Sequence, residues 1–418
     1  MRLGLLLVPA AAAALLTATA QSEPRPSRAA MPEPRPSRAA MPEPRPSRAA
    51  MPEPRPSRAA MPEPRPSRAA MPESQPSRAA MPVRSAADAL PPAQLAGQRI
   101  VFGFDGVRAP RDLLRRVRRG EAAGVILFAR NIRSRGQLRR LTAALQRWRP
   151  AGDPPLLVAI DQEGGVVKRL AGAPRRSPAE LGRAGSEPLA RAEGLDTARN
   201  LRGVGVNVDL APVVDIGRPG RIMRAQGRAF SSRPATVARL AAAFARGLRE
   251  GGVAATAKHF PGLGGARFDQ DRRMNAIDLP AATLRAEDYA PYERLVDDGL
   301  ELVMTSTAAY PALDPDRPAV FSPRILGGEL RGRIGFAGVT ITDSLGTESA
   351  TRFGSPERRA LRAARAGNDL LLFASSYAAG VRAQARLADA LGRGALARAP
   401  FEASAERVAS LRAGLARR

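Results

Sequence analysis

The stretch KHFPGLGGARFDQD, residues 258–271, contains the only histidine of this 418-residue chain and one of its two lysines. Elsewhere the sequence relies on arginine for positive charge. A compact ammonium group and an imidazole donate hydrogen bonds in geometries that the planar fork of a guanidinium does not reach. Lys258 and His259 therefore indicate a polar binding site, and the glycines and aspartates that follow indicate a loop at its edge.

Further polar residues follow other short apolar runs of the chain. Asp161 follows the run LLVAI and Asp343 follows GVTIT, while Arg169 and Arg228 stand in later loops. One carboxylate after a strand commonly caps the next helix. Several such residues together suit many hydrogen bonds to a polyhydroxylated ligand. Glycoside chemistry needs two carboxyl groups, or one carboxyl group and another acid, on either side of the anomeric carbon.

The elements that must position these residues are eight short β-branched or aliphatic runs, which alternate with amphipathic segments. Two of those segments, RGQLRRLTAALQRW and TVARLAAAFARGLREGG, have helical spacing. Eight strands alternating with helices over about 310 residues predict an α/β fold of the (β/α)8 TIM-type barrel class. The loops after the strands of such a barrel converge on one face, which would gather the polar residues. The eight runs are 99–104, 124–128, 156–160, 206–210, 253–257, 302–306, 338–342 and 369–373.

The chain divides into three parts. Residues 1–20 carry an arginine, an apolar run and Ala-Thr-Ala, which is typical of a signal peptide and predicts a secreted or cell-wall-associated protein. Residues 23–82 are six ten-residue units, five EPRPSRAAMP and one ESQPSRAAMP. Proline at this density without an apolar face predicts a disordered, extended linker over 21–97, and a wall-binding role for its arginines is the alternative. The barrel domain, with a C-terminal helix, is predicted over 98–418.

Composition narrows the range of partners. The net charge of +27 favours electrostatic association with an anionic cell wall. Nucleic-acid binding is not expected, because aromatic residues make up only 4% of the chain and no recognition motif accompanies the charge. With no cysteine and one histidine, the sequence predicts neither a metal site nor a cofactor. We expect a monomer acting on a carbohydrate.

A series of motifs then occurs in this order: GVILFARNI, DQEGG, VNVDLAPVVD, GRAF, ATAKHFPG, PAVFS and ITDSL. Over residues 98–375 they resemble the N-terminal domain of glycoside hydrolase family 3, especially single-domain bacterial β-N-acetylglucosaminidases (β-N-acetylhexosaminidases). The resemblance implies that Asp343 is the catalytic nucleophile and forms a covalent glycosyl-enzyme ester. It also implies a sugar subsite lined by Asp161, Arg169, Arg228, Lys258 and His259. The expected activity is secreted, retaining hydrolysis of terminal β-linked sugars, with peptidoglycan fragments as the natural substrate.

The chain departs from the family pattern where the acid/base is expected. In the acetylglucosaminidase subgroup the loop reads KHFPGHG and ends in Asp-Ser-His, whose histidine is the acid/base. Here Leu263 replaces the second histidine of KHFPGHG, and residues 269–271 read Asp-Gln-Asp. Thr307 stands where family members often have a histidine after the sixth strand. The usual proton donor is therefore absent.

Three hypotheses remain open for the missing acid. In the first, Asp271 is the acid/base, because the nearby Asp343 would raise its pKa, although arginines of the same loop would lower it if they pointed inward. In the second, another carboxylate such as Asp269 or Glu348 acts, as in β-glucosidase-like members of the family. In the third, the protein is a catalytically degenerate barrel that binds sugars or the wall.

Overall fold

The computed structural model describes residues 90–417. The predicted signal peptide and the repeats lie outside this range. Helix α1 (Pro92–Gly97) buries Leu95 and Ala96, and the Gln384 side chain of a later helix donates a hydrogen bond to the carbonyl of Ala93. The packed domain therefore begins a few residues before the predicted boundary at residue 98.

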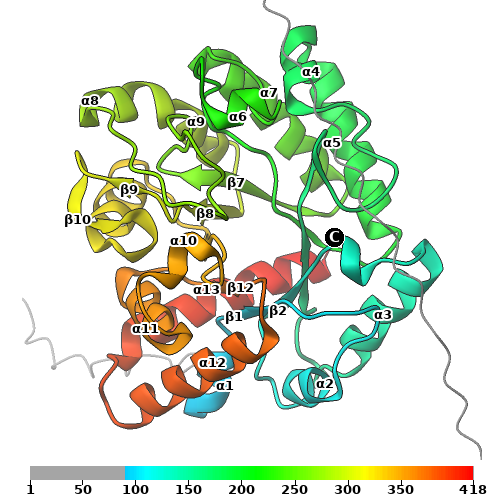
Figure 1. The fold of residues 1–418 in the computed structure, drawn as a ribbon. Coiled ribbons are helices and arrows are strands. Elements are labelled where there is room, and N and C mark those ends of the chain that lie inside the picture. Colours follow the sequence, from blue (N-terminus) through cyan, green and yellow to red (C-terminus); the bar gives the residue numbers. More distant parts are fainter. Residues whose placement is uncertain (1–89, 418) are drawn as a thin grey trace, which may run out of the picture. The chain divides into compact units, whose positions relative to one another are not determined.

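Eight parallel strands form a barrel at the centre of the described domain (Figure 1). Each strand pairs with the next one in chain order, β12 pairs with β1, and a parallel bridge between Ile341 and Leu370 joins the two edges of the sheet. This arrangement confirms the predicted (β/α)8 barrel, and a strand forms at each of the eight predicted runs. The strands are β1 (Ile100–Phe102), β2 (Gly124–Leu127), β3 (Leu157–Ile160), β6 (Val208–Asp209), β7 (Ala254–Phe260), β8 (Leu302–Thr305), β11 (Val339–Thr342) and β12 (Leu371–Phe373).

Helices surround the barrel (Figure 1). In α7, Val237, Leu240, Phe244 and Leu248 recur at helical spacing and are buried, and Pro234 occupies the first turn, where its missing N–H costs nothing. The main helices are α2 (Arg111–Arg118), α3 (Arg135–Arg147), α4 (Pro178–Ala184), α5 (Glu187–Arg202), α7 (Pro234–Glu250), α9 (Ala290–Asp297), η5 (Arg324–Arg333), α11 (Pro356–Ala366), α12 (Tyr377–Gly392) and α13 (Arg398–Ala416).

Shorter elements lie in the connecting loops. They are η2 (Ala129–Asn131), α6 (Ile222–Ala225), α8 (Ala281–Thr283), η3 (Leu284–Asp288), η4 (Ala319–Phe321), α10 (Glu348–Thr351), and the small hairpins β4 (Gln162–Gly164) with β5 (Val167–Lys168) and β9 (Ala309–Tyr310) with β10 (Asp314–Pro318). Between residues 90 and 417, no helix combines the length and the apolar character needed to span a membrane.

The alternation of side chains along the strands explains how polar groups reach the mouth of the barrel. Alternate residues of each strand point inward and form one apolar cluster. Ala159 of β3 belongs to this cluster, and two residues later comes Asp161. Ile341 of β11 likewise precedes Asp343, and the same alternation in β7 turns Lys258 toward the mouth. The two-residue alternation that points apolar side chains into the barrel therefore also places the charged side chains at its mouth.

Helix α13 closes the opposite end of the barrel. Its residues Val408 and Leu415 belong to the same interior cluster, and the Arg412 guanidinium donates to the carbonyls of Pro154 and Pro155 at 2.7 and 2.9 Å. Figure 1 shows α13 crossing behind the strands. The C-terminal helix expected from the sequence is therefore part of the barrel's packing.

Candidate active site

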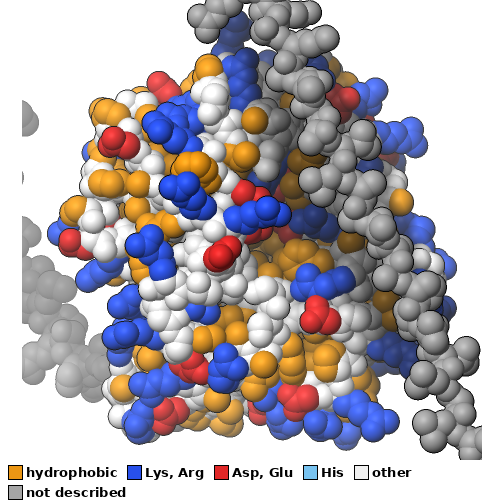
Figure 2. Space-filling model, in the orientation of Figure 1, with side chains coloured by type: hydrophobic (Ala, Val, Ile, Leu, Met, Phe, Trp, Pro, Cys, Tyr) orange, Lys and Arg blue, Asp and Glu red, His pale blue; other side chains and the backbone are white. Residues whose placement is uncertain are grey.

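A cavity of about 600 Å³ opens at the carboxyl ends of the strands. In Figure 2, acidic and basic side chains gather about the centre of this face. All seven site residues proposed from the sequence line the cavity: Asp161, Arg169, Arg228, Lys258, His259, Asp271 and Asp343. Leu263, Asp269 and Glu348 line it as well, so the residues of the competing acid hypotheses share the same space.

The floor of the cavity is a network of opposite charges around Lys258. The Lys258 Nζ lies 2.7 Å from Asp161 Oδ1 and 2.7 Å from Glu163 Oε1, and Arg228 makes two 2.8 Å hydrogen bonds to the Glu163 carboxylate. Burial alone would raise the pKa of Glu163, but Arg228 and Lys258 outweigh it and hold that pKa at about 2. Burial would lower the pKa of Lys258, yet Asp161 and Glu163 raise it above its ordinary value. Glu163 and Lys258 therefore stay ionised at neutral pH.

Glu163 is the member of this network that the sequence analysis left out. Its side chain is fully buried, and it binds both Lys258 and Arg228, two of the predicted sugar ligands. Arg228 therefore uses Nε and Nη2 to bind Glu163, and Nη1 is its remaining nitrogen. The sequence did contain a signal for its role, because Glu163 stands two positions after Asp161 in DQEGG. A glutamate buried at such a place is tolerated only beside a buried cation.

Asp215 fixes the orientation of the His259 imidazole. His259 Nδ1 lies 2.8 Å from Asp215 Oδ2, and Asp215 Oδ1 accepts the backbone N–H groups of His259 and Leu263. Asp215 is fully buried, so a single carboxylate orients the ring and the start of the following loop together. Within the described residues Nε2, the other ring nitrogen, has no hydrogen-bond partner, and His259 lines the cavity.

Asp343 lies at the carboxyl end of β11. The N–H of Ser344 donates to Asp343 Oδ1 at 2.7 Å. Burial raises the pKa of Asp343, while His259, the Ser344 N–H and Lys258 act in the opposite direction. The second oxygen, Oδ2, has no hydrogen-bond partner among the described residues. Asp343 therefore combines a fixed orientation with one oxygen available to a ligand.

Asp271 lies on an exposed loop at the edge of the cavity. Within residues 90–417, no hydrogen bond or ion pair reaches its side chain. Partial removal of water, followed by the charges of Asp343 and Asp269, raises the pKa of Asp271 to about 6. No arginine of the loop is among the main influences on this pKa, and the Arg273 guanidinium stacks on Phe268, 3.9 Å from the ring centre. The site thus offers a carboxyl group that still holds its proton at mildly acidic pH.

The arrangement defines a class of protein. Two carboxyl groups with different surroundings share one cavity above a charged floor, at the end of a (β/α)8 barrel where enzymes of this fold carry their chemistry. A glycosidase active site has this arrangement of two carboxyl groups beside a polar binding surface. Among the described residues, no group of three or more His, Asp or Glu side chains is placed to hold a metal ion.

Comparisons with known proteins agree with this class. The family model described as the glycosyl hydrolase family 3 N-terminal domain matches residues 97–411, and the chain therefore belongs to that family and is a glycoside hydrolase. It is 34% identical over 327 residues to an uncharacterized secreted glycosyl hydrolase of Arthroderma benhamiae, covering 77% of this chain and 93% of that protein. It is 37% identical over 282 residues to a β-hexosaminidase of Alkalilimnicola ehrlichii, covering 65% of this chain and 79% of the relative.

Solved structures resemble the barrel closely. The structure of a family 3 β-N-acetylglucosaminidase from a Paenibacillus species superposes with a TM-score of 0.75 at 32% identity. The alignment covers 78% of this chain and 63% of that one. The likeness thus extends over most of the part of this chain that the structure describes.

Proposed function

We propose that this protein is a secreted, retaining β-glycosidase of the β-N-acetylhexosaminidase type, with Asp343 as nucleophile and Asp271 as acid/base. The observation that carries the proposal is the contrast between these two carboxyl groups. Asp343 is held by the Ser344 N–H at the base of the cavity, whereas the Asp271 side chain at the edge has no partner within residues 90–417 and has a pKa raised to about 6. Retaining hydrolysis needs one ionised and one protonated carboxyl group.

The proposed reaction has two steps. In the first, Asp343 Oδ2 bonds to the anomeric carbon as the glycosidic C–O bond breaks, and the Asp271 proton passes to the departing oxygen. In the second, the Asp271 carboxylate removes a proton from water, the water oxygen bonds to the anomeric carbon, and the ester bond to Asp343 breaks. Asp271 is again protonated and Asp343 is again ionised, so the cycle closes.

The charged floor would bind the sugar. Asp161 Oδ2 lies 3.9 Å from the nearest Arg169 nitrogen, which leaves this oxygen able to accept from a sugar hydroxyl. Lys258 and the remaining Arg228 nitrogen supply donors to the same space, and His259 Nε2, the ring nitrogen that does not face Asp215, is a further hydrogen-bonding atom there. Because Glu163 and Asp215 already hold Lys258 and His259, little freedom is lost when a sugar binds.

The substrate is proposed from the relatives. A β-hexosaminidase and a β-N-acetylglucosaminidase are among the similar proteins, which favours a terminal β-linked N-acetylhexosamine. The secreted relative and the predicted signal peptide favour an extracellular location. Peptidoglycan fragments, which carry this sugar outside the cell, are the substrate class we propose.

Substitution of Asp271 tests the catalytic assignment. Asp271→Ala should lower kcat/KM by ~10²–10⁴-fold on aryl β-N-acetylglucosaminides whose phenols are poor leaving groups. Strongly acidic phenols depart without a proton, so their release should suffer much less. Deglycosylation would then limit the rate, and added azide should accelerate it by attacking the intermediate on Asp343.

Matched variants separate the competing hypotheses. Asp269→Asn and Glu348→Gln change the other carboxylates of the cavity and should retain the wild-type dependence on the leaving group. A neutral Asp271→Ala with a defective Glu348→Gln would transfer the acid role to Glu348. A wild-type protein that binds the sugars but hydrolyses neither aryl β-N-acetylglucosaminides nor aryl β-glucosides would be the degenerate binding barrel.

A further inference from the structure

Gln270 differs from every neighbour on its loop. Residues 267–269 and 271–273 are all exposed, whereas the Gln270 side chain is only 6% exposed. A buried amide in an otherwise exposed loop needs partners for both of its polar ends. Its contacts therefore show what holds the loop in place.

Both ends of the Gln270 amide are satisfied. Its Nε2 donates to Thr307 Oγ1, and its Oε1 accepts from Asn275 Nδ2 at 2.9 Å. Asn275 Oδ1 in turn accepts the N–H groups of Arg267 and Phe268, each at 3.0 Å. Asn275 thus ties the two ends of the loop together, and Gln270 fastens the closed loop to the segment after β8.

The same contacts continue to the nucleophile's loop. Thr307 is fully buried, and its Oγ1 lies 3.3 Å from Ser349 Oγ, which lies 3.0 Å from Thr347 Oγ1. Thr347 Oγ1 then donates to the carbonyl of Ser344, the residue after Asp343. A neutral chain of hydrogen bonds therefore connects the loop of Asp271 with the loop of Asp343.

We propose that Gln270 and Thr307 are positioning residues that fix the distance between the proton donor and the nucleophile. The inference rests on the proposed role of Asp271 as acid/base. The Asp271 side chain has no partner of its own among the described residues, and its backbone carbonyl accepts a hydrogen bond from the Glu348 N–H at 3.0 Å. The position of its carboxyl group is therefore set by a backbone that the Glu348 N–H and the neighbouring Gln270 side chain hold, and misplacement by about 1 Å can cost ~10²-fold in rate.

Removal of the Thr307 hydroxyl is the sharpest test. Thr307→Val keeps the shape of the side chain, and Thr307→Ser keeps the hydroxyl. Thr307→Val and Gln270→Ala should each lose ~10–100-fold in kcat/KM on substrates with poor leaving groups, while substrates with strongly acidic phenols lose little. Thr307→Ser should recover most of the loss. Arg272→Gln, an exposed change on the same loop, is the control and should have no effect.

The dependence on leaving group distinguishes positioning from general damage. In an Asp271→Ala background, Gln270→Ala should cause no further loss, because residues that act through one group are not additive. Equal losses on all leaving groups, or full additivity with Asp271→Ala, would overturn the inference and assign these residues a structural role. If Thr307→Val does not fold, Gln270→Ala serves as the test by itself, because the residues on either side of Gln270 are exposed.

The inference and the proposed function fail differently. If Asp271→Ala is harmless, the acid assignment is wrong, and the positioning inference falls with it. If Asp271→Ala is crippling while Thr307→Val and Gln270→Ala behave as wild type, the acid assignment stands and the positioning inference alone is wrong.

Discussion

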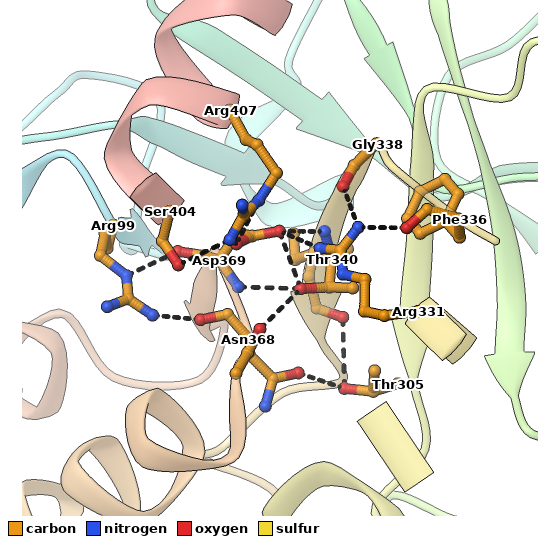
Figure 3. A network of polar contacts seen from close by, with 12 residues as sticks. Arg99, Thr305, Arg331, Phe336, Gly338, Thr340, Asn368, Asp369, Ser404 and Arg407 are labelled. Atoms are coloured by element: carbon orange, nitrogen blue, oxygen red, sulfur yellow. Dashed lines mark hydrogen bonds and ion pairs between the residues drawn. The ribbon is translucent and has the colours of Figure 1, made fainter. Parts of the chain in front are cut away.

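The two ends of the barrel use the same residue types for opposite purposes. At the end closed by α13, the buried carboxylate of Asp369 is surrounded by donors (Figure 3). It accepts from the Thr340 N–H and hydroxyl, from Arg331 at 2.7 Å, and from Arg407 at 2.8 and 3.1 Å. At the open end, Asp343 accepts one backbone N–H and the Asp271 side chain accepts no bond from the described residues.

The contrast shows how stability and function are separated in this fold. The Asp369 cluster joins β11, β12, η5 and α13, because Arg407 belongs to α13 and Arg331 to η5. Arg99, which directly precedes β1, connects that strand to the cluster. Its guanidinium donates to the carbonyl of Asp369 at 3.0 Å and stacks on Phe401, 3.8 Å from the ring centre. At the closed end, the carboxylate of Asp369 is fully hydrogen-bonded and holds the barrel together. At the open end, the carboxylate oxygens of Asp343 and Asp271 that lack a partner among the described residues are available to a substrate.

The largest effect is expected from Asp343→Asn. This change removes the nucleophile and should lower kcat by on the order of 10⁴-fold or more. Burial raises the pKa of Asp343, which means that the fold disfavours its charge, so stability should be unchanged or slightly higher. Initial rates and urea unfolding of the same preparation measure both quantities. A kcat within tenfold of the wild type would contradict the assignment of the nucleophile.

Asp369→Asn should produce the opposite pattern. Removing this charge leaves Arg331 and Arg407 without their carboxylate, which we expect to cost roughly 3 kcal/mol, because both arginines partly reach solvent. Activity at low temperature should remain near the wild-type value. Asp389→Asn is the matched control, since Asp389 forms exposed ion pairs worth about 0–1 kcal/mol. Equal stability of the two variants would refute the anchoring role.

A smaller effect is expected from Asp269→Asn on the pH profile. Asp271 must be protonated to act as an acid, and its pKa is raised to about 6, so kcat/KM should fall as the pH rises through about 6. Asp269 contributes to that increase, and asparagine keeps the oxygen that accepts the Asp271 N–H. The basic limb should therefore move to lower pH by a fraction of a pH unit. A limb that stays in place, or moves upward, would argue against Asp271 as the titrating group.

The smallest effect is expected from deletion of residues 21–84. The repeats carry no apolar face that would dock on a folded domain. The shortened protein should unfold at the same temperature and retain its kcat and KM. A clearly lower unfolding temperature would show that the repeats contribute to the fold.

The fold could be predicted from local sequence patterns, because strand alternation and helical spacing are visible within a few consecutive residues. A strand forms at each of the eight predicted runs, and the predicted helices correspond to α3 and α7. The differences lie at strand ends. We expected β7 to end before Lys258, yet the strand continues to Phe260. The charge of Lys258 is accepted there because Asp161 and Glu163, from a much earlier loop of the chain, neutralise it.

The sequence by itself indicated that Asp161 and Asp343 reach the mouth of the barrel, because each follows an apolar strand and side-chain alternation continues past the last apolar residue. It also determined that the usual histidine acid is absent, because the chain has one histidine. Only the tertiary structure decided which of those groups are satisfied. The Glu163 pairing with Arg228, the raised pKa of Asp271 and the burial of Gln270 against Thr307 all depend on residues brought together from distant loops. Burial and charge act through space, so local sequence does not reveal them.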